Sequence, residues 1–99
     1  MYAIIRTYTG TPELADQLAA RAGEIEEIIS SVEGFKKYFL VRTDDGCSTI
    51  SVFEDEAGAQ ESTRRAAQWL RENASEVKSS PPAITTGDVV VHFGAKARV

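Results

Sequence analysis

Four short runs rich in β-branched and aromatic residues alternate with two stretches whose apolar residues recur at helical spacing. The runs are "YAIIRTY" at residues 2–8, "FKKYFLVRT" at 35–43, "CSTISVFE" at 47–54 and "DVVVHF" at 88–93. Runs of this composition, bounded by Gly, Pro and Asp, are typical of strands. The sequence therefore predicts four strands, and their order along the chain strongly limits the folds that are possible.

A helix is predicted between the first two strands and another between the last two. The first has apolar residues at steps of three and four, which form one stripe on a helix of about five turns: Leu14, Leu18, Ala22, Ile25, Ile29 and Val32. The second follows Asp55, a suitable N-cap, and has an apolar side from Ala59 to Val77. It ends before Pro81 and Pro82, because proline cannot continue a helix.

The order of elements is β-α-β-β-α-β, with "DDG" at 44–46 as a hairpin signal between the two central strands. This is the order of the ferredoxin-like split β-α-β unit. It predicts an α+β fold with a four-stranded antiparallel sheet, in spatial order 4-1-3-2, and both helices on one face. A length of 99 residues suits one domain, so we expect a single domain over residues 1–99.

Neighbouring apolar residues recur within the predicted strands. Since successive side chains of a strand point to opposite faces, both faces of the sheet should be apolar. The adjacent pairs are Ile4–Ile5, Phe39–Leu40 and Val52–Phe53. Monomers rarely expose a patch of this kind, and burying five such side chains contributes about 1.5–3 kcal/mol each before association costs. The pattern predicts a homodimer joined through the sheet face.

Charge and cysteine content limit the partners and the compartment. A net charge of −4 argues against nucleic acid or an anionic membrane as the main partner. The single cysteine, Cys47, allows no intrachain disulfide and suits a reducing cytoplasm. The first residues show no basic stretch followed by a long apolar run, so neither a signal peptide nor a membrane span is expected.

The segment "SVEGFKKYFLVRTDDG", residues 31–46, has a helix end, Gly-Phe, a nearby aromatic residue and a hairpin. Together with the element order, it resembles the dimeric α+β barrel proteins related to the antibiotic-biosynthesis monooxygenases (ABM). The resemblance implies a homodimeric barrel. This superfamily includes cofactor-independent quinone-forming oxygenases, haem-degrading enzymes, lactone isomerases and members without known activity, so the resemblance favours a fold and leaves the reaction open.

The residues of this sequence fit the site residues of one branch of the superfamily better than those of another. Its haem-degrading branch uses an Asn of the first strand and a His of the second helical segment. Here residues 2–8 contain no Asn and residues 58–77 contain no His, so haem is not expected. Its quinone-forming oxygenases use Asn, Trp, Tyr and Arg around a pocket between helices and sheet. All four types occur here, without a diagnostic spacing, and the resemblance implies no cofactor.

Three residues are candidates for catalysis. Trp69 and Asn73 are four residues apart and share one flank of the second helix, which small Ala66 continues. His92 in the last predicted strand could act as a general base. It has no Cys or carboxylate at metal-ligand spacing, so no metal site is expected. The alternatives are a Trp that packs the helix edge or dimer seam, and a His that is structural.

Four further residues are candidates for ligand binding: Arg6, Tyr8, Tyr38 and Arg42. The sequence does not assign their faces, except that Tyr8 shares the face of Arg6. An arginine inside the sheet needs a partner, because an unpaired buried charge is very unfavourable. That partner is either an anionic group of a ligand or a carboxylate of the protein. We expect the carboxylate.

These observations predict a cytoplasmic homodimer that binds a small aromatic or quinone-like molecule between helices and sheet. If it catalyses a reaction, we expect cofactor-independent oxygenation or isomerisation, with His92 as proton acceptor and Asn73 or Arg6 holding an oxyanion. The alternative is a non-catalytic ligand-binding or assembly module of the same fold.

Overall fold

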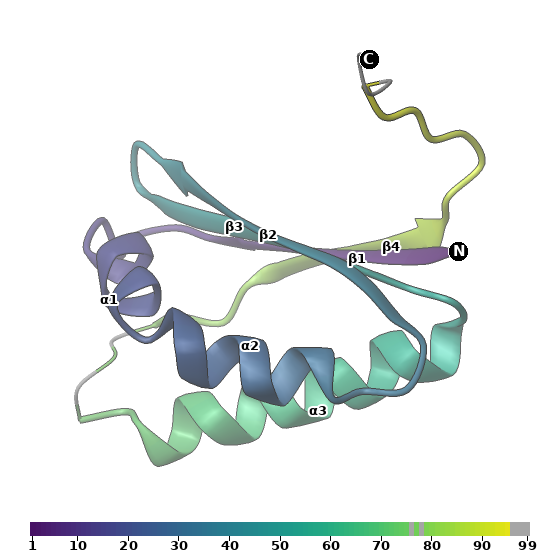
Figure 1. Cartoon of the computed structure of the whole chain (residues 1–99). Helices are drawn as coiled ribbons and strands as arrows, with labels where there is room; N and C mark the ends of the chain where they lie inside the picture. The colour runs from purple at the N-terminus through teal and green to yellow at the C-terminus, as the bar shows by residue number, and fades with distance from the viewer. Residues whose placement is uncertain (76, 78, 96–99) are drawn as a thin grey trace.

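Four antiparallel strands and three helices make up the computed structural model, which describes residues 1–75, 77 and 79–95. The strands form one sheet in the order β2-β3-β1-β4, which is the predicted order 4-1-3-2 read from the other edge. The helices cover one face of this sheet (Figure 1), which confirms the predicted α+β ferredoxin-like fold. The elements are β1 (Tyr2–Tyr8), α1 (Leu14–Ala20), α2 (Ala22–Ser30), β2 (Phe35–Thr43), β3 (Gly46–Phe53), α3 (Glu56–Glu72) and β4 (Ala83–Asp88).

The first predicted helix is divided at Arg21 into α1 and α2. Arg21 has φ −111° and ψ 21°, outside the helical range, and its N–H donates to the carbonyl of Leu18 over 3.0 Å. This bond spans three residues and tightens the last turn of α1. The apolar stripe continues across the break, since Leu14, Leu18 and Ile29 are all buried.

The last strand lies earlier than the sequence predicts. The prediction was residues 88–93, but β4 is Ala83–Asp88. It pairs with β1 from Thr7 opposite Ala83 to Tyr2 opposite Asp88, and one further bond joins the N–H of Val89 to the carbonyl of Met1. Residues 90–95 lie beyond the start of β1 and have no described strand of this chain beside them.

The segment from residue 90 to 95 is exposed and leaves the body on the side of the sheet away from the helices (Figure 1). Its large apolar side chains are the most exposed ones described: Val90 at 89%, Val91 at 65% and Phe93 at 92%. The apolar residues of this segment suggested a strand, but the segment does not pair with this sheet.

The inner face of the sheet is apolar at its two ends and polar between them. On β1 the buried residues alternate as Ile4, Arg6 and Tyr8. Ile4 belongs to one apolar cluster with Phe53, and Tyr8 belongs to another. Buried polar side chains lie between these clusters: Arg6 on β1, Thr49 and Ser51 on β3, and Ser62 on α3. A polar layer thus crosses the core beneath the helices.

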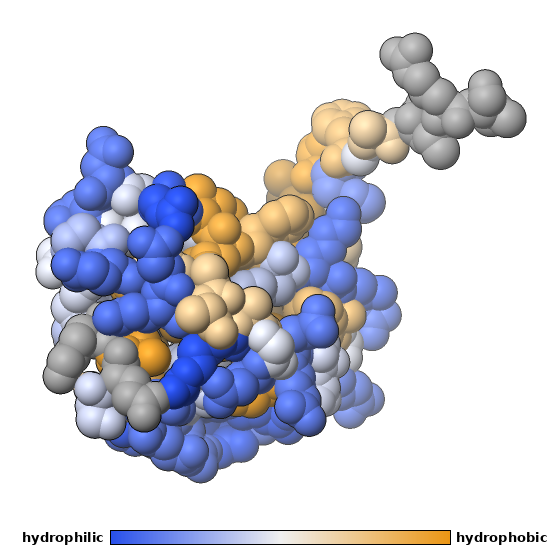
Figure 2. Space-filling view, turned by 60° about the vertical axis from the view of Figure 1, so that its left-hand side comes forward, coloured by the Kyte–Doolittle hydropathy of each residue, from blue (hydrophilic) through white to orange (hydrophobic). Residues whose placement is uncertain are grey.

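The outer face of the sheet is also apolar, as the paired apolar residues predict. Phe39 is 51% exposed and Val41 is 44% exposed. Ile5 and Ile50 lie opposite each other, and Ile50 is also opposite Phe39, so the three side chains share this face. Figure 2 shows apolar surface, in orange, beside the base of the C-terminal segment.

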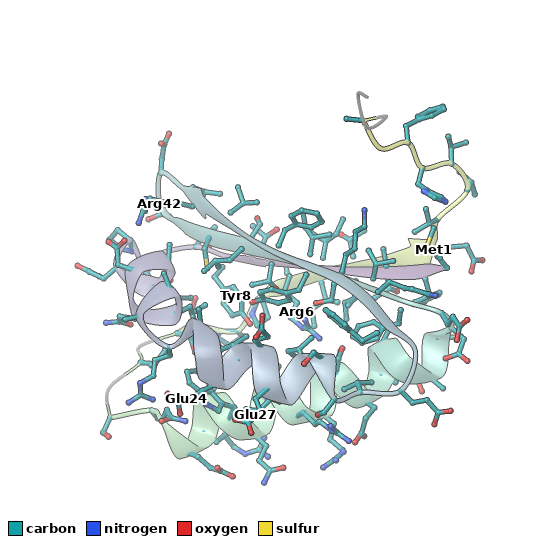
Figure 3. The ribbon with its side chains drawn as sticks, in the orientation of Figure 1. Met1, Arg6, Tyr8, Glu24, Glu27 and Arg42 are labelled. Atoms are coloured by element: carbon teal, nitrogen blue, oxygen red, sulfur yellow. The ribbon has the colours of Figure 1, made fainter. Side chains whose placement is uncertain are left out.

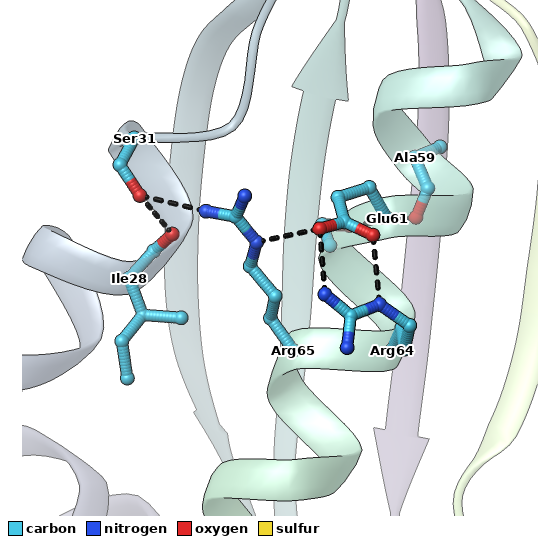
Figure 4. Close-up of polar contacts among 7 residues, drawn as sticks. Ile28, Ser31, Ala59, Glu61, Arg64 and Arg65 are labelled. Atoms are coloured by element: carbon cyan, nitrogen blue, oxygen red, sulfur yellow. Dashed lines mark hydrogen bonds and ion pairs between the residues drawn. The ribbon is translucent and has the colours of Figure 1, made fainter.

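Hydrogen bonds at the start and in the middle of α3 hold this helix in place. The carboxylate of Asp55 accepts from the N–H of Gly58 over 3.1 Å, which confirms the predicted N-cap. Arg65 donates to Ser31 Oγ at the end of α2 and to Glu61, each over 2.8 Å (Figure 4). Arg64 also donates to Glu61, and these hydrogen bonds lower the pKa of Glu61 to about 2.

No helix in the described part of the chain is long and apolar enough to cross a membrane.

Candidate functional site

A cavity of about 40 Å³ lies between the polar layer of the sheet and the helices. This volume has room for about three water molecules. Figure 3 shows Arg6 and Tyr8 of β1 pointing into the space between sheet and helices. Six of the lining residues are aliphatic, and five are aromatic or polar: Leu18, Ile25, Ile28, Ile29, Ala66 and Leu70 in the first group, Arg6, Tyr8, Tyr38, Thr49 and Trp69 in the second.

Arg6 is only 4% exposed and is held by hydroxyl groups. Its Nη2 donates to Ser62 Oγ over 3.3 Å and to Thr63 Oγ1 over 2.8 Å. Both hydroxyls in turn donate to the carbonyl of Ala59. The expectation of a carboxylate partner is therefore wrong for the described residues, because the geometry of β1 and α3 brings hydroxyls to this guanidinium.

The cavity carries one positive charge and two neutral phenols. Burial lowers the pKa of Arg6, and Tyr8 and Tyr38 partly oppose this, but a guanidinium stays protonated at neutral pH. Burial likewise raises the pKa of Tyr8. It also raises the pKa of Tyr38 to about 12, with Tyr8 adding to the shift and Arg6 opposing it. Both hydroxyls thus keep their protons and can donate hydrogen bonds.

Thr49 is a cavity residue that the sequence analysis missed. It lies opposite Arg6 in the pairing of β1 with β3, is 5% exposed and lines the cavity. Its Oγ1 is buried and has no hydrogen-bond partner among the described residues. A signal was present, since the helix-facing positions of β3 include Thr49 and Ser51 where a core strand would have large apolar residues. The pairing with Arg6 was not visible, because it depends on register.

Trp69 lies in the cavity wall, and Asn73 forms a hydrogen bond with its backbone carbonyl. Trp69 is 8% exposed and lines the cavity with Ala66. Asn73 ends α3, and its Nδ2 donates to the carbonyl of Trp69 over 2.8 Å while its Oδ1 accepts from Arg21 over 2.6 Å. The guanidinium of Arg21 also stands 5.8 Å from the centroid of the Trp69 ring, a cation–π distance. Arg21 therefore contacts the indole directly, and Asn73 acts on it through its hydrogen bond with Arg21.

The cavity brings together five of the predicted site residues: Arg6, Tyr8, Tyr38, Ala66 and Trp69. Arg42 does not join them, because it is exposed and pairs with the carboxylate of Asp16. His92 is exposed in the segment after β4 and is not beside Trp69 within this chain. Its predicted place on a sheet face depended on a strand at 88–93, and the ladder between β1 and β4 ends before it.

The sequence profile described as antibiotic biosynthesis monooxygenase matches residues 1–73. The chain belongs to this ABM family. The match includes every residue that lines the cavity and ends before β4 and the exposed segment. None of the curated proteins compared with the sequence matches it.

Solved structures share the ABM fold over almost the whole chain. The NE2512 protein of unknown function from Nitrosomonas europaea is 22% identical, with a TM-score of 0.72 over 97% of this chain and 95% of that one. The haem degrader MhuD from Mycobacterium tuberculosis, with two haems in its active site, is 12% identical, with a TM-score of 0.71 over 95% and 100%. A monooxygenase from the gene ActVA-Orf6 of Streptomyces coelicolor, bound to nanaomycin D, is 19% identical, with a TM-score of 0.65 over 96% and 91%. At these identities the likeness establishes the fold alone.

The cavity residues do not fit haem. A haem iron is held by a protein side chain such as His, Cys, Met or Tyr. The chain has one histidine, and His92 lies outside the cavity, while α3 contains none. Tyr8 and Tyr38 are the cavity residues of these types, but a cavity of about 40 Å³ is far smaller than a porphyrin. No haem chemistry is therefore assigned to this site.

Proposed function

We propose that the cavity binds a small aromatic molecule of the phenol or quinone type. The observation that carries this proposal is a cavity lining that combines a buried guanidinium, Arg6, with two phenols of the sheet and the indole of α3. Small-molecule sites are mostly apolar and contain a few convergent polar groups, as here. Trp69 supplies a flat apolar surface for an aromatic ring, and Arg6 supplies a polar end. Asn73 acts as the positioning residue for Trp69.

The cavity must enlarge to accept an aromatic ring. About 40 Å³ is smaller than a benzene ring, so side chains must move aside. Ile25, Ile28 and Leu70 line the cavity and are only partly buried. Their rotation toward solvent is less costly than moving a strand, because the surrounding helix backbone stays in place. The proposal therefore favours monocyclic or bicyclic ligands over large fused systems.

The reaction that family membership favours is oxygenation by dioxygen without a cofactor. A phenol with a free para position takes one oxygen atom from O₂ at that carbon, and the second oxygen leaves as water with the two hydrogens lost from the ring carbon and the hydroxyl. The product is a quinone. Arg6 would stabilise negative charge on the phenol oxygen, and Tyr38 would donate a hydrogen bond. This chemistry yields no hydrogen peroxide.

We also propose that the protein works as a homodimer through the outer face of its sheet. Phe39 and Val41 are exposed there, and Val90, Val91 and Phe93 extend from the same side. A second copy would cover both surfaces across a twofold axis. Burying five such side chains contributes about 1.5–3 kcal/mol each, enough to exceed the entropy lost on association.

The proposed compartment is the cytoplasm. Cys47 is free and fully buried, and burial raises the pKa of its thiol. A protonated, shielded thiol is compatible with a reducing environment and needs no disulfide partner.

Fluorescence of Trp69 tests the binding step, because it is the only tryptophan of the chain. Titration with 1-naphthol and with 1,4-naphthoquinone should change its emission in a saturable way. Oxygen consumption and quinone absorbance then test the reaction, with peroxide assayed in parallel. Consumption of one O₂ per quinone without peroxide supports the oxygenase. Saturable binding without turnover supports the alternative, a non-catalytic ligand-binding module. An unchanged emission with both compounds contradicts the proposed ligand class.

A further inference from the structure

We infer that the ligand of this cavity binds as an oxyanion, a carboxylate or an ionised hydroxyl, paired with Arg6 and hydrogen-bonded by Thr49. This inference rests on the proposed function and adds the charge of the ligand. It makes Arg6 and Thr49 the residues that select between charged and neutral forms of the same molecule.

The first reason is the unfilled capacity of the Arg6 guanidinium. It has five N–H donors, and Nη2 makes both of the hydrogen bonds to Ser62 and Thr63. Within the described residues, Nε and Nη1 make none, and no carboxylate is paired with Arg6. A buried charge without a counter-charge is strongly unfavourable. A planar oxyanion supplies both the opposite charge and the acceptors that a guanidinium fork engages.

The second reason is the hydroxyl of Thr49, which is independent of the charge. It lies in the cavity wall opposite Arg6, and its Oγ1 is buried without a partner among the residues that the structure describes. Buried hydroxyls in native proteins are almost always hydrogen-bonded. An oxygen atom placed between Arg6 and Thr49 would satisfy both groups at once.

The third reason is that no nearby acid competes for this place in the described structure. Glu61 is on α3 next to Ser62, but its carboxylate is held by Arg64 and Arg65 on the outside of the helix (Figure 4). Tyr8 and Tyr38 also line the cavity, and as neutral phenols they donate to an anion. The site therefore attracts negative charge from several directions.

The test uses 4-nitrophenol, which ionises near neutral pH and absorbs visible light as its phenolate, against the neutral 4-nitroanisole. Binding to the full-length protein is measured by calorimetry, and the pKa of the bound phenol by its absorbance. We expect the phenolate to bind at least about ten-fold more tightly than 4-nitroanisole. The pKa of the bound phenol should fall by about one unit or more, since one unit corresponds to ten-fold tighter binding of the phenolate than of the neutral phenol.

Three variants assign the effect. Arg6→Met should abolish the preference for the anion, and Thr49→Val, which keeps the shape of the side chain, should weaken phenolate binding about five-fold or more. Arg71→Met removes an exposed arginine that does not line the cavity and should change neither value. Thr49→Val keeps the test decisive if Arg6→Met does not fold.

A carboxylate probe separates the two kinds of oxyanion. If 4-nitrobenzoate binds as tightly as the phenolate, the site accepts either anion, and if it does not, the site takes an ionised hydroxyl. Both results agree with the inference. Equal affinity for 4-nitrophenolate and 4-nitroanisole would overturn it while leaving the proposed aromatic ligand intact. Binding of none of these probes would overturn the inference and the proposed function together.

Discussion

Arg6 and Thr49 lie directly opposite each other on β1 and β3, and both side chains face the helices from the middle of the core. Apolar clusters flank them on either side, so these two positions could hold aliphatic residues without any change of fold. Instead they hold a cation without an anionic partner and a hydroxyl without a hydrogen bond among the described residues. Departures of this kind from good core packing are expected at functional sites.

The Arg6→Met substitution should stabilise the free protein. Methionine fills a similar volume and removes a buried charge that no carboxylate neutralises in the described structure. We expect the free energy of unfolding to rise by about 1–3 kcal/mol, and the melting temperature by roughly 4–8 °C for each kcal/mol in a domain of this size. Differential scanning calorimetry measures both. The Arg71→Met control should stay within about 0.5 kcal/mol of the parent. A lower melting temperature for Arg6→Met would contradict the view that this charge serves a ligand.

Stability should fall between about pH 10 and pH 12 because of Tyr38. Its pKa rises from 10.0 to about 12 on folding, so in this window the unfolded chain has released the phenol proton and the folded chain retains it. Raising the pH therefore favours unfolding. Urea denaturation at several pH values should show a steeper loss for the parent than for Tyr38→Phe. Parallel pH curves for the two proteins would mean that the Tyr38 hydroxyl is not buried as described.

Two glycine-to-alanine substitutions should have opposite effects. A Cβ on Gly46 would overlap the carbonyl group of Tyr8 on the neighbouring strand, so Gly46→Ala should cost about 2 kcal/mol or more. Gly23 is exposed near the start of α2, and a Cβ there meets nothing within 4 Å. Gly23→Ala should therefore stabilise the protein by up to about 1 kcal/mol. Thermal unfolding compares the two, and a stable Gly46→Ala protein would disagree with the close pairing of β1 with β3.

Arg21→Ala should loosen the cavity wall at Trp69. The substitution removes the 2.6 Å hydrogen bond to Asn73 and the cation–π contact with the indole. We expect a loss of about 1–2 kcal/mol and an emission of Trp69 shifted toward the red as water reaches the ring. Arg42→Ala is the matched control, because Arg42 makes an exposed ion pair with Asp16 and should lose less than about 1 kcal/mol. Identical spectra for Arg21→Ala and its parent would argue against this role.

Phe39→Glu should convert the proposed dimer into monomers. The residue is half exposed on the outer face of the edge strand β2, opposite Ile50, and a carboxylate there would be buried in a face-to-face dimer. Sedimentation velocity at micromolar concentration measures the result. Arg71→Glu, a charge reversal at an exposed position of α3 on the opposite side of the sheet, should leave the dimer intact. A parent protein that sediments as a monomer would contradict the proposed dimer.

The strands 2–8 and 35–43 could be predicted to the residue, because Gly, Pro and Asp mark their ends and β-branched residues fill them. The strand order followed from the element order. The last strand could not be placed, since "AITTGD" is a weak strand sequence that is selected by pairing with β1. The more strongly β-prone segment that follows lies past the start of that partner.

Composition also identified five cavity residues, but it could not assign their faces. The face of Arg6 follows from the alternation of β1, whose buried neighbours Ile4 and Tyr8 fix the register of the whole strand. The partners of Arg6, Ser62 and Thr63, come from α3, more than fifty residues away. Contacts over such distances depend on how the helix crosses the sheet, which residue types do not specify. The placement of His92 was wrong for a different reason, because the pairing of β4 with β1 ends before this residue.

Nuclear magnetic resonance of the arginine side chains tests the central claim most directly. The Nε–Hε signal of Arg6 can be assigned by its absence in Arg6→Met, and 4-nitrophenolate is then added to the parent protein. The account predicts that the Arg6 signal moves downfield and becomes protected from exchange, while the signals of exposed arginines such as Arg71 stay in place. An Arg6 signal that remains unchanged at saturating 4-nitrophenolate would contradict it.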